Sequence, residues 1–304
     1  MLRKYLSALW SCAFVLLLAA GAVSCSAPSN STKGPLTKDG DQSALDVELV
    51  KTGLYLISGG GGNSLLRFSA TGLILVNGKL PGNYRNFMSQ VRKISKMSDL
   101  PVRVLIVTDH QENHTGNNAE FIDAGVPIIA QENIKTNLKL INSFNKQLAT
   151  SPPIIKFSNN YKLRIGGIEV LLKHFGDAHT NGDTVVYFPN LKVVAVGDLY
   201  TPNTPDPDYL RGGSLVNWGP VLDQILALDF DVVVPSTGST VTRADLEAFK
   251  AKIDTVVFRA SGLIKKGVPK DQFMAQLKTD DLSWQFNFNG DHLDHFYSDL
   301  IRAK

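Results

Sequence analysis

The sequence predicts an α/β (α+β) fold built from two strand-rich halves, each of which ends in helices. Three observations support this prediction. Short apolar or alternating runs are separated by turn-forming residues, many of them glycine, as in antiparallel sheets. Longer segments with apolar residues at helical spacing follow the strands in each half. A hydrophobic content of 43% and a charged content of 19% are those of a globular protein, which excludes a disordered chain.

The first half begins with a predicted meander of short strands. Phe87, Val91 and Ile94 then have the spacing of a helix, and Thr115 is expected to cap a later short helix. In order, we predict strands at 47–50, 54–57, 64–68 and 73–76, a helix at 83–96, a strand at 102–107 buried on both faces over most of its length, a helix at 115–124, a strand at 126–130 and a helix at 132–144.

Four consecutive glycines, at 59–62, separate the second of these strands from the third. A phosphate-binding loop would require a Lys-Ser or Lys-Thr pair and a helix that opens at that point, and the sequence has neither. We therefore predict a flexible hairpin tip.

The second half repeats the strand-rich pattern. We predict strands at 162–165, 169–172, 184–188 and 193–196, a helix at 219–228, a strand at 232–235 and a long helix from Arg243. The remaining C-terminal part is predicted to be mainly helical, with Trp284, Phe296 and Tyr297 as packing residues.

Residues 1–24 have the pattern of an export signal. Arg3 and Lys4 precede an apolar run from 8 to 20, which is too short and wrongly flanked for a stable transmembrane helix. The four residues that end at Cys25 are similar to a bacterial lipobox, apart from Ala at the position that usually holds Leu. We expect a lipid on Cys25 and a lipoprotein at the periplasmic face of a bacterial membrane. Ordinary cleavage nearby would instead give a periplasmic or secreted protein.

The part that follows the signal divides into a tether and one domain. Residues 25–44 are rich in Ser, Pro, Lys, Asp and Gly and have no apolar period, which predicts a flexible tether. Residues 45–304 are predicted to form a single domain with a helical C-terminal extension. Cys12 and Cys25 are the only cysteines, so the processed chain has at most one thiol and no internal disulfide.

The charge balance argues against a nucleic-acid partner. The formal net charge is +3 at pH 7, and loss of Arg3 and Lys4 with the signal leaves +1, because no acidic residue precedes Cys25. A nearly neutral protein has no general attraction to nucleic acid or to anionic membranes. We therefore expect contact with a membrane only through the N-terminal lipid.

Polar residues with metal-ligand chemistry follow several predicted strands. The segments read VTDHQENHTGN at 107–117, GDAHTNGD at 176–183, VGD at 196–198 and VPSTG at 234–238. Their order and spacing resemble the metallo-β-lactamase superfamily, roughly over residues 47–240. This resemblance implies a four-layer αβ/βα sandwich, with a hydrolytic site for one or two zinc or iron ions at one edge.

The resemblance also implies seven ligand positions, most of which carry a changed residue. The equivalents are Asp109, Gln111, Asn113, His114, His179, Asp198 and Thr237. His114, His179 and Asp198 keep the usual ligand type. Asn113 is a neutral amide that accepts no proton, and Thr237 is too short to reach an ion that an imidazole would bind. We therefore expect the two-metal site to be lost.

A single remodelled metal site stays open at this point. Asp109, His114, His179 and Asp198 offer two nitrogens and two carboxylates, an acceptable set for Zn²⁺, with Mn²⁺ and Fe²⁺ as alternatives. The framework points its ligands at two centres, however, so we expect either no metal or one divalent ion. If an ion binds, Asp198 is the expected catalytic residue and Glu112 is the candidate general base.

The remaining polar residues near these segments are assigned supporting roles. Asn77 occupies a position where the superfamily often has a buried Asp beside the ligands. His110 is expected to point away from the site, in a surface or supporting role, and His174 at a strand end is expected to be structural. His292 and His295, spaced i, i+3, indicate an exposed helix face. There is no Gly-x-Ser-x-Gly and no cysteine within the domain, so no other nucleophile is indicated.

Two functions are compatible with these observations. The first is an exported superfamily member that is non-catalytic or weakly active and keeps a pocket for a small molecule. The second is a hydrolase of an ester, lactone, thioester or β-lactam-like bond with a mononuclear metal site. The first is favoured because the Gly, Thr and Pro framework is intact while the losses fall on metal ligands.

Overall fold

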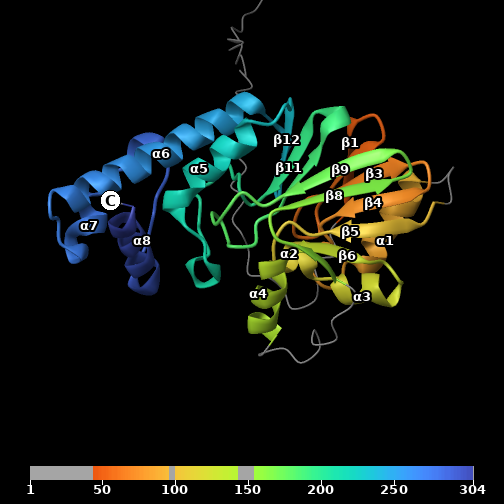
Figure 1. Ribbon diagram of the computed structural model, residues 1–304, viewed down its shortest axis with the longest axis horizontal. Helices are drawn as coiled ribbons and strands as arrows, with labels where there is room; N and C mark the ends of the chain where they lie inside the picture. Colours follow the sequence, from red (N-terminus) through yellow and green to blue (C-terminus); the bar gives the residue numbers. More distant parts are fainter. Residues whose placement is uncertain (1–43, 96–99, 143–153, 304) are drawn as a thin grey trace, which may run out of the picture. The chain divides into compact units, whose positions relative to one another are not determined.

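The computed structural model describes residues 44–95, 100–142 and 154–303. They form two β-sheets with helices on the outer faces, which confirms the predicted four-layer sandwich (Figure 1). The predicted signal, Cys25 and nearly all of the predicted tether lie outside the described residues.

The first sheet has seven strands in sequential order. They are β1 (Asp46–Lys51), β2 (Leu54–Ser58), β3 (Ser64–Ser69), β4 (Gly72–Val76), β5 (Val102–Ile106), β6 (Ile128–Gln131) and β7 (Ile154–Phe157). The strands β1 to β4 are antiparallel neighbours, and β4 to β7 are parallel. The helices that follow these strands are α1 (Tyr84–Ile94), α2 (Glu112–Thr115), α3 (Asn118–Asp123) and α4 (Glu132–Asn142).

The second sheet has six strands in the order β13-β12-β11-β10-β9-β8. They are β8 (Asn160–Ile165), β9 (Ile168–Lys173), β10 (Val185–Phe188), β11 (Val193–Gly197), β12 (Val232–Pro235) and β13 (Val241–Thr242). The pair β11 and β12 is parallel, and the other neighbours are antiparallel. The helices of this half are α5 (Leu215–Leu226), α6 (Arg243–Lys265), α7 (Lys270–Gln276) and α8 (Gly290–Arg302), with single 3-10 turns η2 (Pro189–Leu191), η3 (Tyr209–Arg211) and η4 (Asp280–Leu282).

Three apolar layers hold the sandwich together. Ile106 and Val186 belong to the layer between the two sheets. Phe87 and Phe121 pack helices α1 and α3 against the outer face of the first sheet. Trp218 lies in the third layer, between the second sheet and helices α5, α6 and α8. Each of these side chains is removed from water, which is the main favourable contribution to folding.

The predicted first residues of two helices are wrong. Thr115 ends α2 rather than capping a helix, because its Oγ1 donates to the carbonyl oxygen of Gln111 at 2.9 Å. The next helix, α3, starts only at Asn118. Helix α5 starts well before residue 219, because the Ser214 side chain accepts a hydrogen bond from the Asn217 amide at 3.2 Å and caps it. The strands β7 and β13 were not predicted.

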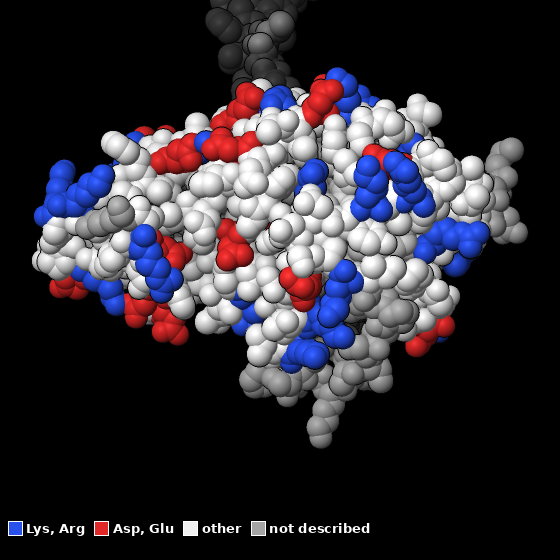
Figure 2. All heavy atoms as spheres, viewed as in Figure 1, with Lys and Arg blue, Asp and Glu red and all other residues white. Residues whose placement is uncertain are grey.

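Charged side chains of both signs are interspersed on the face shown in Figure 2. Arg164 and Glu169, for example, form an ion pair at 2.9 Å across β8 and β9. This mixture fits the small net charge expected for the processed chain. Among the helices that the structure describes, none has the length and apolar character needed to cross a membrane.

Candidate functional site

The polar segments singled out in the sequence converge where strands of both sheets end. Thr108 and Asp109 follow β5, and Asp198 follows β11. The two sheets approach closely here: Gly197 has φ 58°, and a Cβ on it would lie 2.9 Å from the Thr108 hydroxyl. Glycine is therefore needed at position 197 for two reasons: it adopts the positive φ without strain, and it leaves room for the Thr108 hydroxyl.

His114 is held by a carboxylate beneath it. Its Nδ1 lies 2.7 Å from Oδ1 of Asp109, and both side chains are almost completely buried. The same carboxylate oxygen accepts the backbone N–H of Gln111 at 2.7 Å. The hydroxyl of Thr108 lies 3.3 Å from Nδ1 and donates to Oδ1 of Asn77, which is buried as expected. Asp109 thus fixes the orientation of the His114 ring.

His179, on the loop between β9 and β10, is held less closely: its Nδ1 is buried and has no hydrogen-bond partner among the described residues. Its Nδ1 lies 3.7 Å from Oδ1 of Asp183 and 4.0 Å from Oδ2 of Asp109. The backbone N–H and the hydroxyl of Thr180 donate to the Asp183 carboxylate, which keeps Asp183 in place. The Trp218 ring, whose centroid is 6.1 Å from that of His179, forms an apolar wall.

The opposite edges of both rings meet neutral amides. Nδ2 of Asn113 lies 3.0 Å from Nε2 of His114. Nε2 of Gln111 lies 3.2 Å from Nε2 of His179. An amide offers an N–H at one end and a carbonyl oxygen at the other, so it can pair with an imidazole nitrogen in either protonation state. Gln111 and Asn113, at two of the seven positions named from the sequence, thus engage nitrogens of His179 and His114.

Asp198 is held differently from Asp109. Its Oδ1 accepts a short hydrogen bond from the Ser236 hydroxyl. Its Oδ2 is buried, has no hydrogen-bond partner among the described residues and lies 3.8 Å from Nε2 of His114. A buried carboxylate oxygen without a partner is costly, so this atom is the best candidate at the site to bind a cation.

Two groups of side chains have the composition and spacing of a metal site. Their ligand atoms lie within 4.8 Å of one another in each group. The groups are Asp109, His114 and Asp198, and Asp109, His179 and Asp183. The four residues proposed from the sequence are thus divided between two groups that share Asp109.

The donors fit one cation better than two. Nε2 of His114 and Oδ2 of Asp198 face each other, and Asp109 supports the ring from behind, which is the usual arrangement of a metal-bound histidine. Around His179, Asp183 and Asp109 both lie on the Nδ1 side, and Asp109 is already engaged by His114. Gln111 faces Nε2 of His179 with a neutral amide. Thr237 is exposed and belongs to neither group.

The carboxylates and imidazoles shift each other's protonation. Burial raises the pKa of Asp109, but the charge and hydrogen bond of His114 outweigh it and hold that pKa well below its usual range. Burial lowers the pKa of His179, yet Asp183, Asp198 and Asp109 together raise it to about 10. The buried site is therefore neutralised from within, by histidine–carboxylate pairs.

Other sequence-predicted residues lie around this centre. Glu112 is exposed at the start of α2. His110 is buried, so the surface alternative for it is wrong, and its Nε2 lies 3.4 Å from Oδ2 of Asp208. His174 donates from Nδ1 to the backbone carbonyl oxygen of Asp183 at 2.8 Å, in the structural role expected. His295 is exposed and stacks on Tyr209.

Sequence reasoning missed two supporting residues. Asp183 lies four residues after His179, and this spacing was a usable signal for a carboxylate facing the ring. Ser236 directly follows β12, and its hydroxyl donates to Asp198. Nothing in the local sequence indicates that contact, because the two residues come from different strands of the second sheet.

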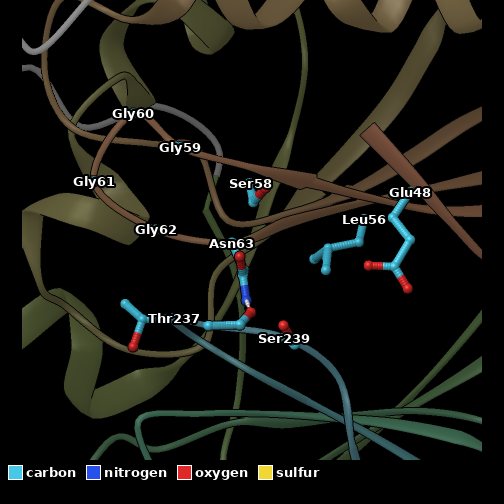
Figure 3. Close-up of a pocket in the computed structure, with 11 residues that line it drawn as sticks. Glu48, Leu56, Ser58, Gly59, Gly60, Gly61, Gly62, Asn63, Thr237 and Ser239 are labelled. Atoms are coloured by element: carbon cyan, nitrogen blue, oxygen red, sulfur yellow. Dashed lines mark hydrogen bonds between the residues drawn. The ribbon is translucent and has the colours of Figure 1, made fainter. Parts of the chain in front are cut away.

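A hollow of about 420 Å³ lies beside the site (Figure 3). Its walls are the glycine hairpin between β2 and β3, the turn after β12, and side chains from β1 and β2. The polar side chains among them are Glu48, Ser58, Asn63, Thr237 and Ser239. Thr237 places this hollow next to the ligand positions, and hydroxyl, amide and carboxylate groups make it suitable for a small polar molecule.

Comparisons with known proteins agree with this geometry. The sequence pattern of the metallo-beta-lactamase superfamily matches residues 60–237. The chain is 27% identical over 245 residues to 2,4-dinitroanisole O-demethylase subunit alpha of Nocardioides sp. (strain JS1661), covering 79% of this chain and 72% of that protein. It is 28% identical over 166 residues to metallo-beta-lactamase IND-1 of Chryseobacterium indologenes, covering 54% of this chain and 66% of that protein.

Solved structures share the fold. A metallo-beta-lactamase from Pontibacter korlensis superposes with a TM-score of 0.58 at 19% identity, covering 69% of this chain and 99% of that one. A stereoselective inverting sec-alkylsulfatase from Pseudomonas sp. superposes with a TM-score of 0.64 at 16% identity, covering 83% of this chain and 47% of that one.

Proposed function

This chain belongs to the metallo-β-lactamase superfamily, and from that premise we propose that it is a ligand-binding member whose two-metal hydrolytic chemistry is lost. The ligand is a small polar molecule bound at the sheet edge, beside the turn that carries Thr237. Any catalysis is weak. The amide contacts described above carry this proposal.

Those contacts support the loss of two-metal chemistry for a simple reason. A metal ion needs an imidazole lone pair, and Nε2 of His114 and Nε2 of His179 are both engaged by amides. Gln111 and Asn113 bring no charge to offset that of a second ion. The buried pair of Asp109 and His114 is hydrogen-bonded without a metal, at 2.7 Å.

A second candidate function has its own supporting observation. The unpartnered Oδ2 of Asp198, facing Nε2 of His114, favours a single divalent ion, with zinc as the first choice. An ion held there would supply an acidified water for hydrolysis of an ester, lactone, thioester or β-lactam-like bond. Asn113 would have to turn its amide oxygen toward the ion or move aside. Glu112 is the proposed general base.

A metal titration separates the two functions. The purified, chelator-treated protein is titrated with Zn²⁺ and then with Mn²⁺ by calorimetry, beside Asp198→Asn and the matched exposed control Asp231→Asn. The first function predicts no stoichiometric binding at micromolar metal. One tight equivalent that disappears in Asp198→Asn and persists in Asp231→Asn would overturn it and establish the single-ion site. Any zinc-loaded protein is then assayed on esters, lactones and an aryl methyl ether, the last suggested by the name of the O-demethylase relative.

We also propose that the chain is an exported lipoprotein anchored through Cys25. The support is the N-terminal pattern of Arg3 and Lys4, an apolar run and small residues before the cysteine. In a bacterial host, the wild-type protein should be found in the membrane fraction and Cys25→Ser in the soluble fraction. If the wild type and Cys25→Ser are found in the soluble fraction in equal amounts, the proposed lipid anchor at Cys25 is wrong.

A further inference from the structure

Lys79 is a completely buried lysine outside every ligand position. Its Nζ donates to the carbonyl oxygens of Ile57 and Gly62, each at 2.5 Å. The amine also lies over the ring of Phe87, 5.6 Å from its centroid. No carboxylate forms an ion pair with it among the described residues, and burial lowers the pKa of Lys79 to about 7. Two N–H groups remain on the neutral amine, enough for the two carbonyls.

Two features of Lys79 are energetically unfavourable, so other interactions in the folded protein must offset them. Burial of an amine without a carboxylate partner is unfavourable. The backbone of Lys79 also has φ 73°, in the left-handed region that non-glycine residues seldom adopt. Such costs persist where the surrounding structure depends on the contacts made. The contacts here are with the two ends of the glycine hairpin between β2 and β3.

The hairpin is fastened on its other side to the second sheet. The backbone N–H of Asn63 donates to the carbonyl oxygen of Ser236 at 2.7 Å. The Asn63 amide donates to the carbonyl oxygens of Pro235 and Gly238, at 2.9 and 2.8 Å. Figure 3 shows Asn63 beside the turn that carries Thr237. Lys79 on one side and Asn63 on the other therefore determine where the tip lies.

Gly62 brings the hairpin into contact with the site. A Cβ on Gly62 would lie 3.0 Å from the Ser236 carbonyl oxygen and 3.3 Å from Nδ2 of Asn113. Asn113 contacts Nε2 of His114, and Ser236 donates to Asp198. A displacement of Gly62 would therefore change the space available to both neighbours.

We infer that Lys79 is a positioning residue: by holding the Gly62 carbonyl it fixes the glycine hairpin against Asn113 and Ser236, and so sets the geometry of the site. The lysine acts through the hairpin and touches neither ligand nor metal. Its effect on the hairpin is independent of the proposed function, whereas its effect on ligand or cation binding rests on that function.

Hydrogen exchange measured by mass spectrometry tests this inference. Lys79→Met keeps the length of the side chain and removes both hydrogen bonds. We expect amides of residues 59–63 to exchange about tenfold faster in this variant, as loss of buried hydrogen bonds implies, while amides of β8 and β9 are unchanged. Equal exchange of residues 59–63 in the two proteins would overturn the inference.

Lys252 provides a matched control. It donates to the carbonyl oxygen of Leu282 at 3.0 Å and lies over the Trp284 ring, 5.3 Å from its centroid, far along α6. Lys252→Met therefore removes the same kinds of contact in a different region. It should leave exchange of residues 59–63 unchanged. Faster exchange of residues 59–63 in Lys252→Met would mean that the hairpin responds to destabilisation anywhere in the protein, and the inference would fail.

A second variant displaces the hairpin without changing Lys79, which matters if Lys79→Met does not fold. Gly62→Ala should push the tip away from Asn113 because of the close approaches above, and should also speed exchange at 59–63. Unchanged exchange in Gly62→Ala would contradict the claim that this contact positions the hairpin. If the wild-type protein binds Zn²⁺, both variants should weaken binding severalfold; if it binds none, the exchange result still stands.

Discussion

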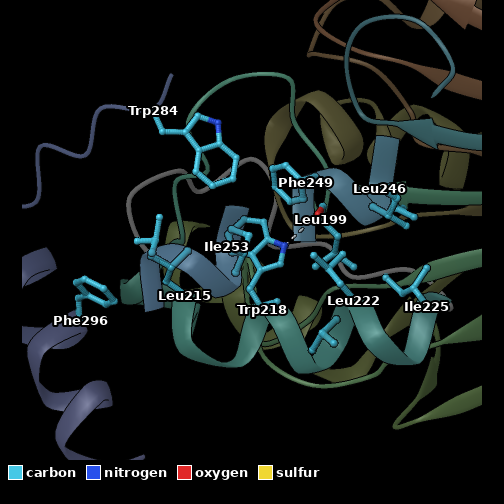
Figure 4. Close-up of a cluster of buried hydrophobic side chains, with 14 of the residues drawn as sticks. Leu199, Leu215, Trp218, Leu222, Ile225, Leu246, Phe249, Ile253, Trp284 and Phe296 are labelled. Atoms are coloured by element: carbon cyan, nitrogen blue, oxygen red, sulfur yellow. Dashed lines mark hydrogen bonds between the residues drawn. The ribbon is translucent and has the colours of Figure 1, made fainter. Parts of the chain in front are cut away.

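Two adjacent buried regions of this protein are stabilised by different physical effects. Around Trp218, helices α5, α6 and α8 enclose an apolar cluster with Phe249 and Trp284 as its large members (Figure 4). At the neighbouring sheet edge, Asp109 and His114 are equally buried but carry charge. The first region is favourable because apolar area leaves water, and the second is tolerable only because its polar groups pair.

The two regions are also connected, and the connection explains how a polar site stays ordered. The Trp218 indole N–H donates to the carbonyl oxygen of Leu199 at 3.0 Å, and Leu199 directly follows Asp198. The same indole packs against the His179 ring. The apolar cluster therefore holds two site residues in position. This support comes from apolar packing and a backbone hydrogen bond, so it does not depend on a metal ion.

The largest expected effect comes from placing the residues that the superfamily resemblance implies at four positions of the polar edge. The variant carries Asp109→His, Gln111→His, Asn113→Asp and Thr237→His. It should bind about one zinc ion per chain more than the wild type, because the amides that block Nε2 are gone and three imidazoles and a carboxylate at position 113 are added. Metal content after dialysis measures this. No gain in zinc would show that the backbone geometry for two ions has been lost as well.

Removing the apolar support should have the next largest effect. Trp218→Ala leaves a large cavity and is expected to lower the free energy of unfolding by about 3–5 kcal/mol. It also deletes the hydrogen bond to Leu199. Urea unfolding measures the change, and Trp218→Phe is the milder control. A loss below about 1 kcal/mol in Trp218→Ala would mean that the cluster collapses around the gap and contributes little.

Breaking the buried pair at the polar edge should cost somewhat less than the loss of Trp218. Asp109→Asn leaves His114 without its counter-charge and is expected to lower the free energy of unfolding by about 3 kcal/mol. The double variant Asp109→Leu, His114→Leu removes both charges and should be less destabilised than Asp109→Asn. If the double variant is less stable than Asp109→Asn, the buried pair itself stabilises the fold, as the apolar cluster does.

Much of the fold was predictable from local patterns. The segments at 73–76 and 102–107 read as apolar strands, and β4 and β5 lie there as parallel neighbours. Helix α1 followed from the spacing of Phe87 and Val91, both buried. The start of α5 was missed because the Gly219–Pro220 pair resembles a boundary, whereas the Ser214 cap places both residues inside the helix.

The site was predictable in its members but not in its contacts. His114 and Asp198 were singled out by their segments, and the structure brings them to 3.8 Å. That Asp109 supports the Nδ1 side of a ring, rather than facing the same centre as the other donors, depends on side-chain direction. Side-chain direction is set by packing between the sheets, which spacing along one strand does not reveal. The buried contacts of Lys79 are long-range for the same reason.

The smallest expected effect over a single pH unit is a pH dependence that separates Lys79 from the histidines of the polar edge. The pKa of Lys79 falls from 10.5 to about 7 on folding, so between these pH values the unfolded chain holds the proton that the folded chain has lost. Stability from this group therefore rises with pH across that window, by at most about 1.4 kcal/mol per pH unit. His179, whose pKa is raised to about 10, acts in the opposite direction, because its contribution is present at low pH and is lost as pH rises toward 10.

Urea unfolding of the wild type and Lys79→Met, measured at several pH values, isolates the lysine because both proteins keep His179. The difference between the two free energies should shift in favour of the wild type as pH rises from 7; a constant difference would mean that Lys79 stays protonated and is stabilised by the two carbonyls and the Phe87 ring.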